Sequence, residues 1–427
     1  MASSKEFVTR RIGKNIIFPI ALFLFLTIGN YSFFRYSFSG KEYTSLLLQS
    51  ISNIRLIIPL WIVSYCLWFN FSMTIKIIKE HIDILFLGLS WLISCLLSMD
   101  AISYLLYGLW SFFSLISILL FVCYSAVISS TSKIFLYRII HTLWIGNFII
   151  LMLDIISILT TKPYNGMYQI IFSSNTFWAY PTLIIGILSL VKIRLTTDQL
   201  LKKLYYLCIL AISLFAIYFS ARRSPLFSLI LSTILYFIPS RLPNLLLALC
   251  ILIMSYTLVN SPTGDRLTES LPDSYMKYRL QRMLGMVKGQ QETSYTERQK
   301  IWKMYLERFY KKPVMGEGLA SMQRIMATKE SKKKDFSAHN TFIGLLAETG
   351  LLGSLLMLIV VSRSIFQTLR LANNAWLRIY ILLFIPTILI NWVEYNLIPG
   401  QIFFLYTMII WILPRGLHYV KNNFKTP

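Results

Sequence analysis

Long runs of apolar, uncharged residues recur along the chain and restrict what it can fold into. The first extends from Ile16 to Phe34, and similar runs follow almost to the C-terminus. A helix of about 20 apolar residues crosses the roughly 30 Å of hydrocarbon in a bilayer, and its backbone groups pair within the segment. Since 56% of the 427 residues are hydrophobic and only 14% are charged, a soluble domain is excluded. We predict an all-α polytopic membrane protein.

The runs divide into about twelve predicted transmembrane helices. We expect them near Ile16–Phe34, Leu56–Ile75, Ile82–Met99, Ile102–Ser129, Ile139–Thr160, Asn175–Val191, Leu204–Phe219, Pro225–Ile238, Pro243–Val259, Thr341–Val361, Trp376–Val393 and Ile402–Leu413.

Basic residues between the runs gather on the side of the N-terminus, which the positive-inside rule makes cytoplasmic. Both termini are then inside. The chain divides into nine spans in residues 1–260, a periplasmic loop in residues 261–339, and three spans in residues 340–427. The loop is rich in Lys and Arg, so it is either an ordinary solvated loop or a surface that attracts an anionic, lipid-linked substrate.

An amphipathic helix is predicted inside this loop, from Thr296 to Lys312. Trp302 and Phe309 belong to its apolar stripe with Tyr305 and Leu306. Arg298 lies four residues before Trp302 on the same stripe, where a guanidinium is costly unless it meets an anion. The alternatives are that it extends toward water or pairs with a structural carboxylate. A second helix is predicted from Pro272 to Lys288.

Two arginines precede the predicted eighth span on the external side. Ser224 is a typical N-cap and Pro225 a typical first helical residue, so Arg222 and Arg223 stand at the positive end of a helix dipole. Exposed N–H groups and guanidiniums together form a site for phosphate. The alternative is contact with lipid headgroups.

His339 is the only one of the four histidines that this topology places outside. Its ordinary pKa of about 6.5 suits a general base at neutral pH, although a lone interfacial histidine also serves structural roles. Asn340 is a predicted N-cap for the tenth span. Glu348 shares a face with small residues and is expected to face protein, whereas Glu394 is expected where the eleventh span emerges outside.

The five cysteines fall within or beside apolar runs and show no metal-ligand spacing. We expect them to be buried small hydrophobic residues, and we expect no metal site.

Three motifs carry a resemblance to a known family. His339-Asn340, then nine residues, then Gly350-Leu-Leu-Gly353 resembles the signature of bacterial O-antigen ligases and related O-antigen polymerases. The segment from Arg298 to Trp302, followed by Pro313-Val-Met-Gly316-Glu-Gly318, is similar to that family's upstream stretch. Ser220-Ala-Arg-Arg-Ser224 resembles its Ser-x-Ser-Arg motif, with Arg222 in place of the second serine and Arg223 at the family arginine.

This resemblance implies an all-helical, C-type glycosyltransferase fold in the inner membrane, with its active site facing the periplasm and no metal or other cofactor. The donor would be an oligosaccharide on undecaprenyl diphosphate. Arg223 and Arg298 would bind the diphosphate, and His339 would accept a proton from the acceptor hydroxyl in an inverting displacement. Arg222, Asn340, Trp302, Glu348 and Glu394 would contribute to substrate binding. The partners would be the acceptor glycan, the bilayer and a chain-length regulator, with no nucleic acid.

Polymerase and ligase share these motifs and differ in the acceptor, which is another lipid-linked repeat or lipid A–core. Ser224-Pro225 and the turn from Asn391 to Gly400 favour a polymerase. A protein O-glycosylating relative is disfavoured, since those chains carry a further C-terminal extension. A lipid-linked oligosaccharide flippase, which would carry charges along a path at mid-span, is the alternative of another class.

Overall fold

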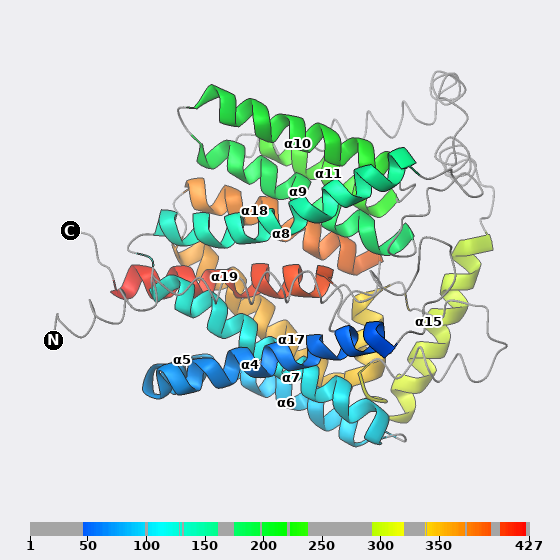
Figure 1. Ribbon diagram of the computed structural model, residues 1–427. Helices are drawn as coiled ribbons and strands as arrows, with labels where there is room; N and C mark the ends of the chain where they lie inside the picture. The colour runs from blue at the N-terminus through cyan, green and yellow to red at the C-terminus, as the bar shows by residue number, and fades with distance from the viewer. Residues whose placement is uncertain are drawn as a thin grey trace.

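The chain forms a bundle of helices in a computed structural model (Figure 1). The structure describes residues 46–98, 101–127, 129, 132–160, 175–196, 199–219, 223–237, 293–319, 338, 340–371, 374–393 and 402–423. Within these ranges the regular elements are all α-helices: α4 (Leu46–Phe69), α5 (Phe71–Glu80), α6 (Ile82–Leu96), α7 (Ala101–Val127), α8 (Ser132–Thr160), α9 (Asn175–Leu195), α10 (Leu200–Phe219), α11 (Arg223–Phe237), α15 (Thr293–Lys311), α17 (Thr341–Leu371), α18 (Asn374–Val393) and α19 (Ile402–Asn423).

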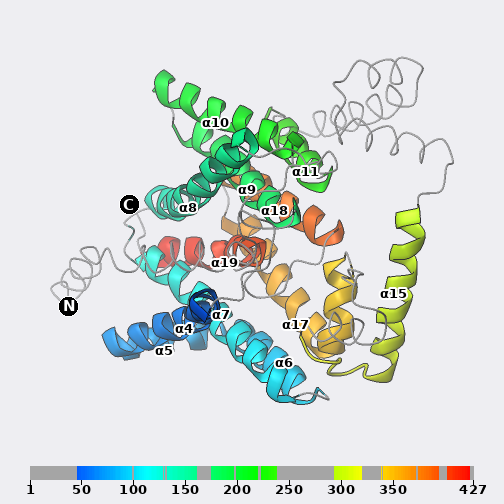
Figure 2. The ribbon, with the colours of Figure 1, turned by 45° about the vertical axis from the view of Figure 1, so that its right-hand side comes forward.

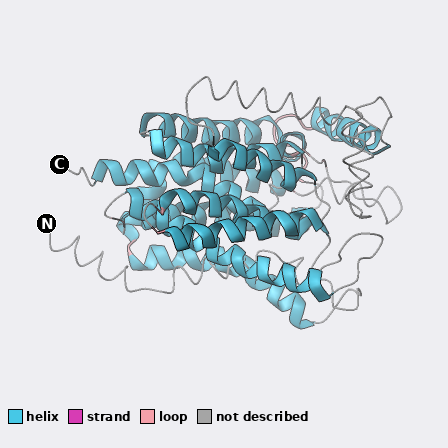
Figure 3. Ribbon diagram, turned by 90° about the horizontal axis from the view of Figure 1, so that it is seen from above, coloured by secondary structure: helices cyan, strands magenta, loops and turns pink. Residues whose placement is uncertain are grey.

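Helix α19 lies at the centre of the bundle. The helices α4–α7 lie on one side of it, and α8–α11 with α18 lie on the other (Figures 1 and 2). Viewed from above, the long helices run side by side (Figure 3). Phe404, Met408 and Trp411 of α19 are almost completely buried. A helix buried on all its faces forms the core of a large helical protein, which explains why this run is apolar all round.

Three helical segments in the described part of the chain are long and apolar enough to cross a membrane. They are Gly108–Val127 in α7, Leu200–Ile217 in α10 and Thr341–Arg370 in α17. The protein is therefore a helical membrane protein. The number of twelve spans stays a prediction, and the expected spans Ile16–Phe34 and Pro243–Val259 lie outside the described residues, as does the expected helix Pro272–Lys288.

The expected span Leu56–Ile75 is broken at Asn70. The chain bends there by 118° between α4 and α5. The Asn70 side chain accepts a hydrogen bond from the backbone N–H of Met73 at 3.1 Å and so begins α5. The hydroxyl of Thr74 lies 2.8 Å from the carbonyl oxygen of Cys66 and 2.8 Å from the hydroxyl of Tyr124. Side chains thus satisfy the backbone groups that the break frees, as a break inside a membrane protein requires.

Replacing Thr74 with Val should destabilise the bundle by about 1–3 kcal/mol, because buried polar groups at the break lose their partner. The hydroxyl of Thr142 in α8 donates to the carbonyl of Arg138, four residues earlier, at 2.9 Å, but this bond is exposed. Thr142→Val is therefore the matched control and should change stability little. Thermal unfolding of the purified protein in detergent measures both variants. Equal midpoints for the two would contradict this account of the break.

Candidate active site

Helix α15 lies across one end of the bundle (Figures 1 and 2) and packs against α17. Its bounds, Thr293–Lys311, confirm the amphipathic helix expected from the sequence. Tyr305 is completely buried and Trp302 is half-buried, whereas Lys303 and Glu307 are exposed. The predicted apolar stripe is therefore the face that α15 turns toward the protein.

A hydrogen bond from Trp302 joins α15 to the start of α17. The indole N–H of Trp302 donates to the carbonyl oxygen of Ala338 at 2.6 Å. Ala338 is completely buried and directly precedes His339 in the chain. The backbone on the N-terminal side of His339 is thereby fixed to the helix that carries Arg298.

Asn340 fixes the chain on the other side of His339. Its side-chain oxygen accepts hydrogen bonds from the backbone N–H groups of Phe342 at 2.9 Å and Ile343 at 3.0 Å. This is the N-cap that the sequence predicts, and it is confirmed. The next residue, Thr341, donates from its hydroxyl to the side-chain oxygen of Asn391 in α18 at 3.0 Å. The residues flanking His339 are therefore anchored to α15 and α18.

Helix α17 is interrupted at Gly350, which has φ 66° and ψ −166°. The segment Pro313–Gly318, here called the strap, runs along the break. The N–H groups of Leu351 and Leu352 donate to the carbonyls of Pro313 and Val314 at 2.8 and 3.1 Å. In return, the N–H groups of Glu317 and Gly318 donate to the carbonyls of Ala347 and Glu348 at 3.0 and 2.8 Å. The break and the strap satisfy each other's backbone groups.

Glycine is required on both sides of this contact. A Cβ atom on Gly350 would overlap the backbone of Val314, and one on Gly316 would overlap the backbone of Glu348. Both residues also have positive φ, 66° and 69°. The backbone of Gly350 lies in a region of φ and ψ that only glycine commonly occupies. These glycines belong to the motifs that carry the family resemblance, and the structure gives the physical reason for them.

Glu317 lies between two glycines in the strap and is buried, with 4% of its surface exposed. Its carboxylate lies 3.0 Å from the ammonium group of Lys312 and 3.7 Å from the guanidinium of Arg308. It therefore ties the strap to the C-terminal turn of α15. From α6, the hydroxyl of Ser94 donates to the carbonyl of Glu348 at 2.6 Å, so a third helix supports the same break.

The structure brings together some of the expected site residues. Trp302 bonds to the residue before His339, and Asn340, the residue after His339, caps α17. Glu348 is completely buried, as predicted. Arg298 is half-buried on α15, one helical turn before Trp302. His339, Arg222 and Glu394 lie outside the described residues.

Arg223 is the first residue of α11. Ser224 therefore lies inside this helix and not before it, and the helix begins two residues before the expected first helical residue, Pro225. The side chain of Arg223 lies outside the description. Helix α11 packs against α18 and α9.

Glu317, Ser94 and Asn391 support the site, and the sequence alone did not single them out. For Glu317 a signal was present, because a carboxylate between two glycines follows Arg308, in the last turn of α15, and Lys312, directly after that helix. Ser94 and Asn391 act through partners distant in the sequence, which no local pattern identifies. Among the described residues, no group of three or more His, Cys, Asp or Glu could hold a metal ion.

Residues 208–358 match the family model described as O-antigen ligase. This part of the chain is therefore similar to the O-antigen ligase family. The match covers less than half of the 427 residues but includes Arg223, Arg298, His339, the strap and the break at Gly350. It confirms the resemblance that the motifs carry. A comparison with curated proteins found no match.

Replacing Gly350 with Ala should destabilise the protein by at least about 2 kcal/mol, through strain at positive φ and overlap with the strap. Gly186 of α9 has ordinary helical backbone, and a Cβ atom there would meet the side chains of Leu229 and Ser213 and no backbone, so Gly186→Ala is the control and should cost less stability than Gly350→Ala. Thermal unfolding in detergent compares them. A Gly350→Ala protein as stable as the control would mean that the strap does not need this close approach.

Proposed function

We propose that this protein is a surface-polysaccharide (O-antigen) polymerase of the inner membrane. It transfers a glycan from undecaprenyl diphosphate to a sugar hydroxyl of another lipid-linked repeat, on the periplasmic face and without a metal. The family match supports glycan transfer, because residues 208–358 include the three proposed catalytic residues, Arg223, Arg298 and His339. The bond between Trp302 and Ala338 carries the proposal further, because it joins α15 to the residue before His339.

The proposed role of Arg298 rests on its place in α15. It lies four residues before Trp302, so the two share a face of the helix. Arg308 and Lys312 are paired with Glu317, but Arg298 makes no ion pair among the described residues. A half-buried guanidinium that no described carboxylate pairs with suits the anionic diphosphate of the substrate.

The proposed reaction is a single displacement. The acceptor hydroxyl oxygen attacks the anomeric carbon of the donor sugar while the bond from that carbon to the diphosphate oxygen breaks. His339 accepts the proton of the hydroxyl, and undecaprenyl diphosphate leaves with the bonding electron pair. Arg223 and Arg298 stabilise the negative charge that develops on the leaving group, a role that preorganised cations perform effectively in a site shielded from water. The configuration at the anomeric carbon inverts.

Other expected residues take supporting roles in this proposal. Arg222 and Glu394 bind substrate near the proposed catalytic groups. Asn340 and Glu348 hold the start of α17, as their burial and the N-cap bonds suggest. The acceptor is a second lipid-linked repeat, and a chain-length regulator is the proposed protein partner.

The second candidate is an O-antigen ligase, which uses the same donor and transfers it to lipid A–core. The description of the matching family favours it. The proline in the first turn of α11 and the segment from Asn391 to Gly400 favour the polymerase. Both candidates need the same proton acceptor and the same diphosphate site, so a cellular product analysis has to separate them.

Deletion of the gene, followed by complementation with the wild type or with His339→Ala, tests the proposal. We expect the deletion to abolish the polysaccharide ladder on a gel and to leave a single repeat attached to the lipid A–core. The wild type should restore the ladder, whereas His339→Ala should lower glycan transfer by about 10²-fold or more, because the proton acceptor is lost.

The pattern of the deletion strain separates the candidates. Unsubstituted core together with accumulated lipid-linked polymer would identify a ligase and overturn the polymerase proposal. An unchanged ladder would overturn both. Membrane extracts should contain equal amounts of wild type and His339→Ala. A folded His339→Ala protein with full activity would contradict the general-base role alone.

Replacing Trp302 with Phe should lower kcat by about tenfold with a small change in KM, since the aromatic ring stays and only the bond to Ala338 is lost. Trp144 of α8 also donates an indole hydrogen bond, to the hydroxyl of Ser189 at 3.0 Å, away from α15. Trp144→Phe is thus the matched control, with a similar stability loss and unchanged kcat. Transfer assays with purified lipid-linked repeats measure both, and equal kcat values would contradict a positioning role for Trp302.

A further inference from the structure

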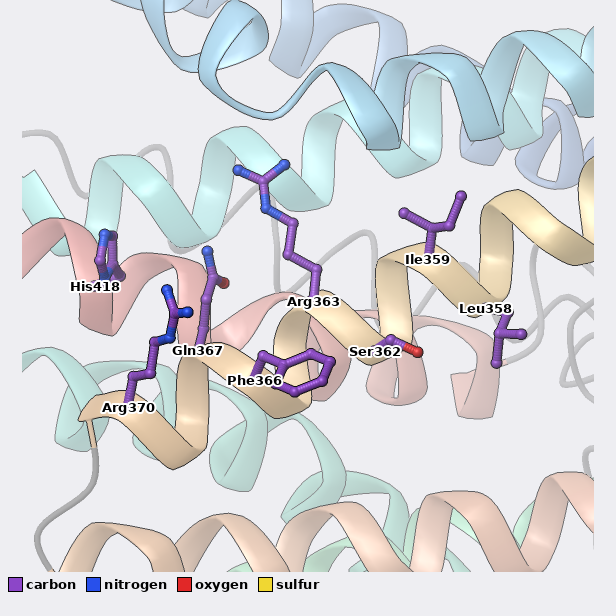
Figure 4. Close-up of a pocket in the computed structure, with 8 residues that line it drawn as sticks. All are labelled: Leu358, Ile359, Ser362, Arg363, Phe366, Gln367, Arg370 and His418. Atoms are coloured by element: carbon purple, nitrogen blue, oxygen red, sulfur yellow. The ribbon is translucent and has the colours of Figure 1, made fainter.

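A groove of about 630 Å³ opens along the second half of α17 (Figure 4). It lies toward the end of the bundle opposite α15 and includes His418 of α19 (Figure 1). The residues of α17 that line it recur on one stripe of the helix: Leu358, Ile359, Ser362, Arg363, Phe366, Gln367 and Arg370. The proposed reaction uses none of them.

The groove changes from apolar to basic along its length. Leu358 and Ile359 lie at one end, whereas Arg370, Gln367 and His418 lie together at the other (Figure 4). The twelve residue steps from Leu358 to Arg370 correspond to about 18 Å of helix. That length is close to half of the roughly 30 Å hydrocarbon thickness of a bilayer. The groove therefore matches a single lipid molecule of one leaflet in its length and in its change from apolar to polar.

The apolar side chains of this stripe are exposed on the surface of the bundle. Leu358, Ile359 and Phe366 are 60%, 50% and 64% exposed. They belong to a helix that is long and apolar enough to cross the membrane. Acyl chains are the natural cover for such side chains, because an exposed aliphatic row in a membrane helix contacts lipid.

Among the described residues, positive charge exceeds negative charge at the basic end of the groove. Asp83 of α6 accepts from Arg415 at 2.6 and 2.8 Å and from Arg363 at 2.9 Å, so one carboxylate pairs with two guanidiniums. Arg370 is exposed and makes no ion pair among the described residues. Burial, followed by the charges of Arg415 and Arg363, lowers the pKa of the nearby His81 to about 3. An added anion would balance this excess.

We propose that this groove binds an anionic phospholipid of the leaflet at the end of the bundle opposite α15. Its phosphate lies at Arg370, with Arg363 and His418 beside it, and its acyl chains lie along Phe366, Ile359 and Leu358. A basic site between membrane helices is the kind of site that selects anionic headgroups. The proposal depends on the groove and its charges and not on the proposed enzymatic reaction.

Binding of phosphatidylglycerol to the purified full-length protein in nonionic detergent, measured by native mass spectrometry, tests this proposal. Phosphatidylcholine with the same acyl chains and inorganic phosphate are the comparison ligands. We expect phosphatidylglycerol to bind at least about fivefold more tightly than phosphatidylcholine. Arg370→Gln should weaken phosphatidylglycerol binding by about fivefold, the effect of one cation near an anionic lipid.

Lys202→Gln is the control, because Lys202 is an exposed cation of α10 outside the groove and its loss changes the net charge equally. It should leave phosphatidylglycerol binding unchanged. Phe366→Ala keeps every charge and should weaken the binding of both lipids. Equal effects of Arg370→Gln and Lys202→Gln, or equal binding of the two phospholipids, would overturn the proposal. Inorganic phosphate binding as tightly as the lipid would also overturn it, in favour of a simple anion site.

Discussion

The rest of the site depends on the interruption of α17 at Gly350. A helix broken inside a membrane protein exposes N–H and C=O groups that lipid cannot satisfy. Here the strap, Pro313–Gly318, accepts from two of the freed N–H groups and donates to two carbonyls. The strap follows α15 directly in the chain, so its docking also fixes the C-terminal end of that helix. Burial of Glu317 with Lys312 and Arg308 strengthens the same attachment.

Helix α15 is consequently held at two points, and this determines where Arg298 lies. The strap holds its last turn, and the hydrogen bond from Trp302 to Ala338 holds its middle. Ala338 and Asn340 flank His339, and Asn340 is fixed as the N-cap of α17. Arg298, one turn before Trp302, and the two residues that flank His339 therefore belong to one connected unit. Catalysis by positioned groups requires such a connection, because misplacement by about 1 Å costs about 10²-fold in rate.

Local patterns in the sequence predicted much of this unit. Periodicity gave α15 and its buried face, and capping preference gave the start of α17 at Asn340. The burial of Glu348 was also predicted correctly. The breaks at Asn70 and Gly350 were not predicted, because hydropathy reports how apolar a segment is and says nothing of where its backbone changes direction. Gly316 and Gly350 did mark special positions, but their pairing joins segments more than thirty residues apart, which spacing alone cannot establish.

The break also explains how one helix can serve two different ends of the bundle. Beyond Gly350, α17 is anchored near its other end by Arg363, which shares Asp83 with the completely buried guanidinium group of Arg415. Removing one member of such a buried cluster leaves charge uncompensated, so its geometry is strongly constrained. A continuous helix would transmit the orientation set there to His339. Because the backbone turns at Gly350, the segment before it, which Thr341 joins to Asn391 of α18, need not be collinear with the segment after it, which Arg363 joins to Asp83 of α6. The interruption thereby separates the requirements of the candidate active site from those of the opposite end.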